Sequence, residues 1–326
     1  MLRFFNNNQI HTAFFVILAA LPFLISPLYR MELASYNLPD FIDFFKLNSH
    51  LLLAIFSVLI LVQAFWLNYL VNYYRIGKKT SYYSSIIFVL VTVSFNSKGV
   101  LNSSLFSSLL MIAAIQQYFK AYDNKNTVKE IFNAAFFCAT AVILNPQTIV
   151  FLIFAIASWL KVRSFNTKEF FIILLGLLLP FYLIGTYMYL NDNLLKYINY
   201  QFGYFALIKT TINANLIFWI LISGIGLLSL ISIINFQRIK AKTNIREQKY
   251  IDLMFYLLFF SCFFWIGNSN IDANSLSLLG LPLSVLISLN LQSIKNQRLA
   301  ELQFFVLLAV AILANYGEQI FKIFGL

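Results

Sequence analysis

Carboxylates are the residues of this sequence with the clearest capacity for chemistry. Glu32, Asp40 and Asp43 stand in one polar stretch between two apolar runs. A carboxylate just outside a membrane span can act as a general base, or can hold a divalent cation against a lipid phosphate. Glu32 also stands close to Arg30, and such a pair at an interface more often forms a solvated ion pair of little energetic worth. Both interpretations stay open.

Other residue types that carry chemistry give weaker signals. His11 and His50 lie at the ends of separate apolar runs, where a single histidine is more often an interfacial anchor than a metal ligand. Cys138 and Cys262 lie inside apolar runs without a partner at metal or redox spacing, which is typical of small buried hydrophobic residues. The sequence contains no phosphate-binding glycine loop, HExxH or CxxC motif. We therefore predict no metal ligands and assign no cofactor.

The elements that must position these residues are membrane helices. Of the 326 residues, 60% are hydrophobic and 11% are charged, whereas a soluble domain has about 45–50% apolar and about 25% charged residues. These proportions exclude a soluble globular enzyme, a disordered chain and a fibrous repeat. The net charge of +11 could suggest nucleic acid. Basic residues also collect in the cytoplasmic loops of membrane proteins, and we expect no nucleic-acid partner.

The apolar runs are rich in Leu, Ile and Phe on all sides, without the period-two alternation of barrel strands. A spanning helix needs roughly 20 mostly apolar residues. We therefore predict an all-α polytopic transmembrane helix bundle of about eleven spans, with short helical hairpins, in a single integral membrane domain over residues 1–326. The runs are 11–29, 51–74, 81–95, 100–119, 131–144, 148–160, 169–190, 214–235, 250–266, 276–293 and 302–317.

Residues 131–144 and 148–160 form a short pair of runs. As a helix the first would rise only about 21 Å, against a hydrocarbon core of about 30 Å. Two short spans, a re-entrant hairpin and one kinked helix are the alternatives. Basic residues stand in the loop before the pair and in the loop after it, so both loops should be cytoplasmic. The chain must therefore go out and come back between them.

The distribution of basic residues predicts the topology. With a cytoplasmic N-terminus and eleven crossings, most of the 23 basic residues fall inside. The first run is expected to be retained, since no small-x-small cleavage site follows it. Residues 30–50 and 191–213 then lie outside, and each is expected to contain a helix in the membrane surface. The basic residues placed outside are Arg30, Lys46, Lys98, Lys196, Lys209 and Lys322.

The order of these segments resembles the GT-C class of lipid-linked sugar transferases. The sequence departs from that class in having Asn102 where an acidic residue is frequent, and Asn145-Pro146 where a Lys-Pro is frequent. The chain is also similar to uncharacterised multi-pass inner-membrane proteins of Bacteroidota, which implies a location in the bacterial inner (cytoplasmic) membrane. The matching stretches are LYRMELASYNLPDF at 28–41, NYYRIGKKTSYYSSIIFVL at 72–90, FNSKGVLNSSLFSSLLMIAAIQQYFKAY at 95–122, NAAFFCATAVILNPQTIVFLIFAIASWL at 133–160 and NSNIDANSLSLLGLPLSVLISL at 268–289.

The resemblance implies transfer of a sugar from a polyprenyl-phosphate donor at the outer face of the membrane. Glu32 would be the first-loop acid that activates an acceptor hydroxyl, with Asp40 or Asp43 as substitutes. Two other hypotheses stay open: a non-enzymatic membrane subunit or scaffold, and an uncoupled transporter of lipid or small molecules. Ion coupling is less expected because no ionisable residue lies centrally in a run. The residues that could meet the donor phosphate are Arg30, Lys46, Lys98 and Lys196.

Overall fold

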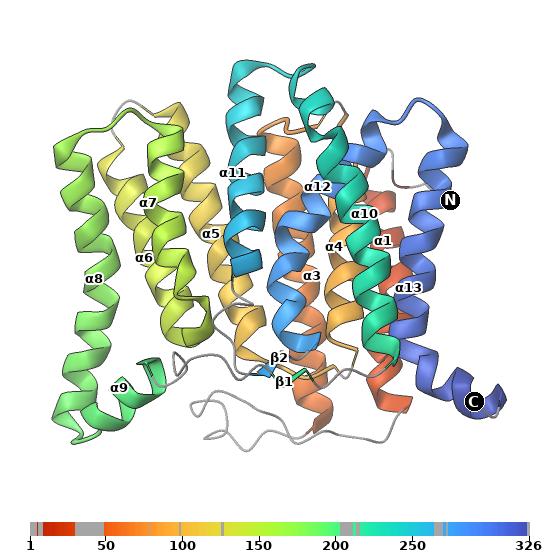
Figure 1. Ribbon diagram of the computed structural model, residues 1–326, viewed down its shortest axis with the longest axis horizontal. Helices are drawn as coiled ribbons and strands as arrows, with labels where there is room; N and C mark the ends of the chain where they lie inside the picture. The colour runs from red at the N-terminus through yellow and green to blue at the C-terminus, as the bar shows by residue number, and fades with distance from the viewer. Residues whose placement is uncertain are drawn as a thin grey trace. The chain divides into compact units, whose positions relative to one another are not determined.

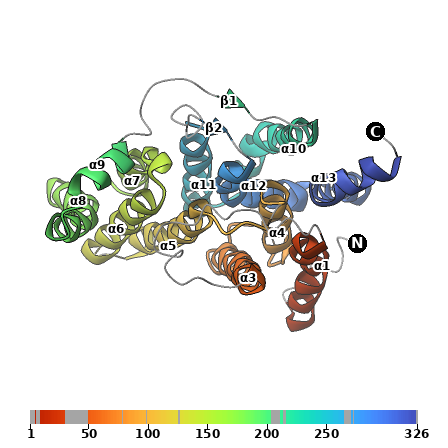
Figure 2. The same cartoon turned by 90° about the horizontal axis from the view of Figure 1, so that it is seen from below.

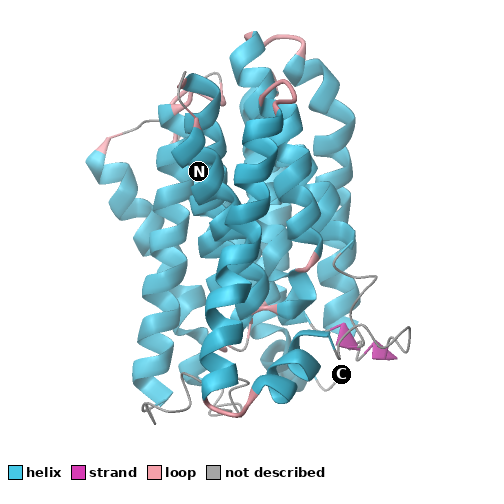
Figure 3. Cartoon of the chain, turned by 90° about the vertical axis from the view of Figure 1, so that its left-hand side faces the viewer, coloured by secondary structure: helices cyan, strands magenta, loops and turns pink. Residues whose placement is uncertain are grey.

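The computed structural model is almost entirely α-helical in the part of the chain that it describes (Figure 3). Each predicted apolar run contains a helix that covers most of its described residues, as expected where backbone groups have no water to bond. The predicted all-α class is therefore confirmed. The described residues are 5, 9–29, 49–77, 79–97, 99–124, 127–202, 211–212, 216–263, 270–271 and 273–324.

Five of the described helices are long and apolar enough to cross a membrane. They cover His50–Tyr73, Thr167–Leu190, Phe218–Lys240, Leu276–Ser293 and Gln297–Gly317. Three shorter apolar helices cover His11–Pro27, Tyr83–Phe95 and Pro146–Val162. These helices are compatible with an integral membrane protein. The predicted number of about eleven spans is larger than the number of these helices and stays a prediction.

The chain folds into two compact units. Unit 1 comprises residues 1–105, 214–248 and 272–326, and unit 2 comprises residues 106–213 and 249–271. The helices of unit 1 are α1 (Ile10–Tyr29), α3 (Ser49–Tyr73), α4 (Tyr83–Phe95), α10 (Leu216–Lys240), η5 (Ala273–Leu279), α12 (Gly280–Ser293) and α13 (Gln297–Phe324). Unit 2 contains most of α5 (Ser103–Asp123) and of α11 (Ile245–Phe263), with α6 (Val128–Leu144), η2 (Pro146–Thr148), α7 (Val150–Val162), α8 (Thr167–Leu190) and α9 (Leu194–Phe202).

Helix α4 forms the centre of unit 1 and is buried along its whole length. It packs against α1, α3, α12 and α13, which surround it when the unit is seen from below (Figure 2). Small and hydroxyl-bearing residues allow α4 and α12 to approach closely: the hydroxyls of Ser84 and Ser288 lie 2.9 Å apart, and a Cβ on Gly280 would lie 2.8 Å from Thr92 Cγ2. Such residues are common where membrane helices pack tightly.

Unit 2 is built around the α6–η2–α7 hairpin and α8, which lies beside α6 (Figure 1). Pro146 begins the short 3-10 turn that separates α6 from α7, since proline lacks the N–H that a continuous helix needs. Hydrogen bonds join residues on either side of the hairpin, from Arg163 to Asn124 and from Thr127 to Glu169. The two loops therefore meet at one end of the unit, which confirms the predicted out-and-back path.

The 191–213 segment contains α9, so the predicted helix exists there, while the helix expected within residues 30–50 falls outside the described residues. Gln201 on α9 donates a hydrogen bond to the carbonyl of Ile143 at the end of α6, 3.1 Å away. A short parallel pair, β1 (Thr211–Ile212) with β2 (Asn270–Ile271), was not predicted. It joins the end of the 191–213 segment, which is predicted to lie outside, to Asn270–Ile271 just before η5.

Candidate functional site

Most residues of the predicted site lie beyond the part of the chain that the structure describes. They are Arg30, Glu32, Asp40, Asp43, Lys46 and Lys98. Lys196 is described, and its side chain is exposed on α9 just after α8 ends. The next residue, Tyr197, has a buried hydroxyl with no hydrogen-bond partner among the described residues, and burial raises its pKa. The structure thus brings none of the predicted acids and cations together within its described part.

An apolar groove of about 790 Å³ runs along one side of unit 1. Ile86 and Leu90 of α4 form its floor, and α1 and α13 form its walls. The wall residues of α13 recur every four positions, so they share one face of that helix. We call this feature the α1–α4–α13 groove, and its lining residues are Phe5, Phe15, Leu18, Ala19, Pro22, Phe23, Ile86, Leu90, Phe304, Leu308, Ile312 and Tyr316.

Polar contacts hold the two walls of the groove together near the C-terminal end of α1. The Tyr316 hydroxyl donates to the carbonyl of Pro22, 2.6 Å away, and the Ser26 hydroxyl lies 3.0 Å from Asn315 Oδ1. Ser26 Oγ also lies 2.8 Å from the carbonyl of Phe23. That carbonyl has lost its usual helical donor because Pro27 has no N–H. Pro27 therefore frees a backbone carbonyl of α1 that the Ser26 hydroxyl satisfies.

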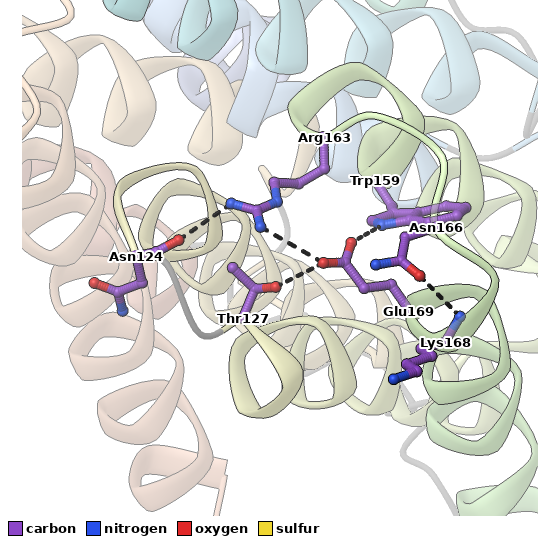
Figure 4. Close-up of polar contacts among 7 residues, drawn as sticks. All are labelled: Asn124, Thr127, Trp159, Arg163, Asn166, Lys168 and Glu169. Atoms are coloured by element: carbon purple, nitrogen blue, oxygen red, sulfur yellow. Dashed lines mark hydrogen bonds and ion pairs between the residues drawn. The ribbon is translucent and has the colours of Figure 1, made fainter.

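A buried carboxylate, Glu169, is the centre of the polar contacts in unit 2 (Figure 4). It accepts hydrogen bonds from Trp159 Nε1 at 2.8 Å and from Thr127 Oγ1 at 3.0 Å. Arg163 Nη2 lies 3.6 Å from Glu169, and Arg163 Nη1 donates to the carbonyl of Asn124 at 3.2 Å. We call these five residues the Glu169 cluster. The carboxylate is only 10% exposed, and its three partners compensate for the loss of water.

The start of α8 positions Glu169. Asn166 precedes the helix, and its side-chain oxygen accepts a hydrogen bond from the N–H of Lys168 at 3.1 Å. This N-cap places Glu169 in the first helical turn, where the positive end of the helix dipole favours a carboxylate. A polar cavity of about 280 Å³ adjoins the carboxylate and is lined by Tyr122, Val162, Arg163, Ser164, Asn166 and Glu169.

A second ion pair lies at the same end of unit 2. Lys161 Nζ is 3.0 Å from Asp252 Oδ2, and Lys249 Nζ donates to the carbonyl of Lys161 at 2.9 Å. The Tyr250 hydroxyl donates to Asp123 Oδ1 at 2.8 Å. These contacts connect the end of α7 with α11, and α11 with the end of α5. Because every charge in this network has a partner, the arrangement suits a fixed structural tie better than a reactive acid or base.

Sequence reasoning missed the Glu169 cluster, although one local signal was available. Asn166 is followed three residues later by Glu169 at the start of an apolar run, and this spacing is typical of a capped helix N-terminus. Nothing in the sequence indicates that Trp159 and Thr127 converge on that carboxylate. Among the residues that the structure describes, no group of three His, Cys, Asp or Glu comes together to hold a metal ion.

The fold and these sites define a helical protein with several helices suited to crossing a membrane. A family model described as a family of unknown function (DUF6427) matches residues 13–324, and the chain belongs to that family. Comparison with curated proteins and with solved structures finds no match.

Proposed function

We propose that this protein is an integral protein of the bacterial inner membrane that binds the hydrocarbon chain of a lipid in the α1–α4–α13 groove. The observation that carries the proposal is the groove itself, which is large, apolar and open to the side of unit 1. Ligand pockets in proteins have volumes of about 300–1,000 Å³ and mostly apolar linings. In a membrane, the molecules that reach such a groove from the side are lipids.

The length of the groove suits a hydrocarbon chain. From Phe304 to Tyr316 the α13 wall extends about 18 Å, more than half of a hydrocarbon core of about 30 Å. An extended hydrocarbon chain lying along α13 fits this length and the apolar lining of the groove.

The charges of unit 2 support a cytoplasmic location for one of its ends. Lys161, Arg163 and Lys249 gather there through the contacts of the Glu169 cluster and of the second ion pair. Basic residues near the ends of membrane helices favour the cytoplasmic side. We infer that this end is cytoplasmic. Continuing the predicted alternation of spans along the chain gives a cytoplasmic N-terminus and about eleven crossings.

Filling the groove is expected to prevent lipid binding. Ala19 lines the α1 wall, and Ala19→Trp would place an indole in the space that the chain occupies. We expect the variant to retain several-fold less lipid than the wild type. The measurement is native mass spectrometry of the full chain released from nanodiscs of bacterial lipid, with the bound lipid counted per protein.

Ala309→Trp is the matched control, because Ala309 lies on α13 but is exposed and does not line the groove. It should retain lipid as the wild type does. Equal lipid retention by all three proteins would contradict the proposal. A stoichiometric protein partner together with an empty groove would favour the scaffold hypothesis.

A finer proposal assigns the lipid as the polyprenyl-phosphate sugar of a GT-C-like transferase. The groove supports it because a polyprenyl chain is a long hydrocarbon that enters laterally. In this proposal Glu32 activates the acceptor hydroxyl at the outer face, with Asp40 or Asp43 as substitutes. The donor phosphate meets one of the outside cations Arg30, Lys46, Lys98 and Lys196.

Removing the first-loop acid should abolish sugar transfer. Glu32→Gln keeps the size of the side chain but removes the base, so transfer from a polyprenyl-phosphate sugar in vesicles should fall by about 100-fold or more. Asp40→Asn and Asp43→Asn identify which acid acts if Glu32 does not. Transfer that survives all three substitutions, each made alone, would exclude a first-loop base.

A further inference from the structure

The polar cavity beside the Glu169 cluster lies at the junction of α7 and α8. It has a volume of about 280 Å³, and Val162 is the one apolar residue among the six that line it. Both helices are apolar along their length, so in a membrane their junction lies at the level of the lipid head groups. We call this cavity the Arg163 pocket, and its polar lining residues are Tyr122, Arg163, Ser164, Asn166 and Glu169.

Arg163 has hydrogen-bond donors to spare beside this pocket. Its guanidinium carries five N–H groups, and among the described residues it makes one hydrogen bond, from Nη1 to the carbonyl of Asn124 at 3.2 Å (Figure 4). Nη2 lies 3.6 Å from Glu169 Oε1, which is an ion-pair contact but too long for a hydrogen bond. The side chain is 30% exposed, so a ligand can reach its remaining donors. Such a planar fork of N–H groups suits the oxygens of a phosphate.

The orientation of Asn166 adds a further donor. Its Oδ1 accepts the backbone N–H of Lys168 at 3.1 Å, and a backbone N–H can only donate. The Asn166 oxygen is thereby fixed toward the helix, and its Nδ2 is the group left over. Within the described part of the chain, this Nδ2 and the hydroxyls of Ser164 and Tyr122 make no hydrogen bond. The free groups of the pocket can therefore all donate, which favours a ligand rich in acceptor oxygens.

Contacts within unit 2 hold the lining of the pocket in place. The ring of Tyr122 packs edge-on against Tyr250, with their centroids 5.7 Å apart, and Tyr250 is bound in turn to Asp123. Arg163 is held by the Asn124 carbonyl, and Asn166 is held by its role as the cap of α8. Groups that are already oriented lose less conformational freedom when a ligand binds.

The charges around the pocket favour an anion in spite of Glu169. The Glu169 carboxylate accepts hydrogen bonds from Trp159 and Thr127, and it faces the charge of Arg163. The segments 120–130, 161–169 and 249–252 meet at this end of unit 2 through the contacts described above. Their described residues include six basic and four acidic side chains, a net charge of +2. A local excess of positive charge raises the concentration of anions at the pocket.

We propose that the Arg163 pocket binds a phosphate group. The guanidinium of Arg163 and the Nδ2 of Asn166 donate to the phosphate oxygens, with the two hydroxyls as further donors. The chemistry is the same for the phosphate of a lipid head group and for free phosphate, and basic pockets between membrane helices are typical sites for lipid phosphates. The pocket belongs to unit 2 and the α1–α4–α13 groove to unit 1, so the proposal is independent of hydrocarbon binding.

The test is ligand-dependent melting of the purified full chain in a neutral detergent. One arm titrates inorganic phosphate against sodium chloride at matched ionic strength, since salt screens exposed charges. The other arm titrates a short-chain phosphatidylglycerol against diacylglycerol of the same chain length, which lacks the phosphate. The wild type should melt at higher temperature as the phosphate ligand is added. Stabilisation by the phospholipid alone identifies a lipid head group, and stabilisation by inorganic phosphate shows that the phosphate group itself suffices; either outcome supports the pocket.

Asn166→Asp separates phosphate binding from the stability of α8. Aspartate caps a helix as well as asparagine does, but the substitution replaces the free donor with a negatively charged oxygen, so affinity should fall by about tenfold or more. Asn296→Asp is the matched control. Asn296 precedes α13 in unit 1, and its Oδ1 accepts the backbone N–H of Arg298 at 3.1 Å in the same way. This variant carries the same added charge and should bind phosphate as the wild type does.

Arg163→Lys gives a second, independent reading of the pocket. Lysine keeps a positive charge beside Glu169 but lacks the planar fork, so phosphate affinity should fall several-fold. This variant keeps the test decisive if Asn166→Asp does not fold.

Three results would overturn the proposal. The first is a wild type that neither phosphate ligand stabilises beyond its reference, and the second is equal affinity in the wild type, Asn166→Asp and Arg163→Lys. The third is an equal loss in Asn166→Asp and Asn296→Asp, because net charge alone would then explain the effect. Ala19→Trp should bind phosphate as the wild type does, so failure of the groove and failure of this pocket give different results.

Discussion

Replacing Glu169 with alanine is expected to lower the free energy of unfolding by about 3 kcal/mol, near the lower end of the range for breaking a buried ion pair. The change leaves the Trp159 and Thr127 donors without an acceptor in a buried place. It also removes the counter-charge of Arg163. We place the loss at the lower end because the Arg163 side chain is 30% exposed and can turn toward water. Denaturant unfolding in detergent, followed by tryptophan fluorescence, measures the loss.

Two further variants separate the charge of Glu169 from its hydrogen bonds. Glu169→Gln keeps one acceptor but loses the charge, so the loss should be smaller, about 1–2 kcal/mol. Glu247→Ala is the matched control, because Glu247 also lies in the first turn of a helix and has no hydrogen bond or ion pair among the described residues. Its effect should be within about 0.5 kcal/mol. Losses of equal size for Glu169→Ala and Glu247→Ala would show that the cluster does not hold unit 2 together.

Enlarging Gly176 is expected to separate α6 from α8, at a cost of about 3 kcal/mol or more. A Cβ at this position would lie 2.8 Å from the carbonyl oxygen of Phe132 and 2.9 Å from Ala135 Cβ. Backbone atoms of a packed helix cannot move aside locally, so the whole of α8 must shift. Gly176→Leu should therefore unfold at a much lower denaturant concentration than the wild type in the same measurement.

Gly185 provides the control on the same helix. No atom lies within 4 Å of a Cβ built there, and Gly185→Leu replaces a poor helix former with a good one. This variant should be as stable as the wild type or slightly more stable. If Gly176→Leu and Gly185→Leu unfolded at the same denaturant concentration, close packing between α6 and α8 would not be what stabilises unit 2.

The path of the chain in unit 2 was predictable because charge placement is a local property of the sequence. Lys120, Lys125 and Lys129 precede the hairpin, and Lys161, Arg163 and Lys168 follow it. Two loops that are both rich in basic residues favour the same side of a membrane. The chain therefore had to return to its starting side at the end of the hairpin. The pairing of Arg163 with Glu169 was not predictable in the same way. It depends on the packing of α6, α7 and α8, which brings Thr127 and Trp159 to the same carboxylate.

The candidate sites and buried polar groups likewise include residues that the sequence points to and residues that only the packing reveals. The first-loop acids drew attention because a carboxylate beside a span stands out in a chain with few charges. Asn96 and Ser277 did not, because a buried asparagine or serine usually makes an interhelical hydrogen bond. Gln63, another buried polar residue, makes such a bond: its amide donates to the carbonyl of Leu105 at 2.7 Å. Only the packed helices show that Asn96 Nδ2 and the Ser277 hydroxyl are buried without a hydrogen-bond partner among the described residues.

The sequence by itself determined that this chain is helical and suited to a membrane. Long apolar runs without central charges must satisfy their backbone groups internally, and a helix does so within one segment. The tertiary structure decided which side of each helix faces protein. Lipid tails are as apolar as leucine, so hydrophobicity does not distinguish a lipid-facing side from a packed one. The groove, the close approach of α6 and α8 at Gly176 and the Glu169 cluster all depend on that choice, and the packed helices alone reveal it.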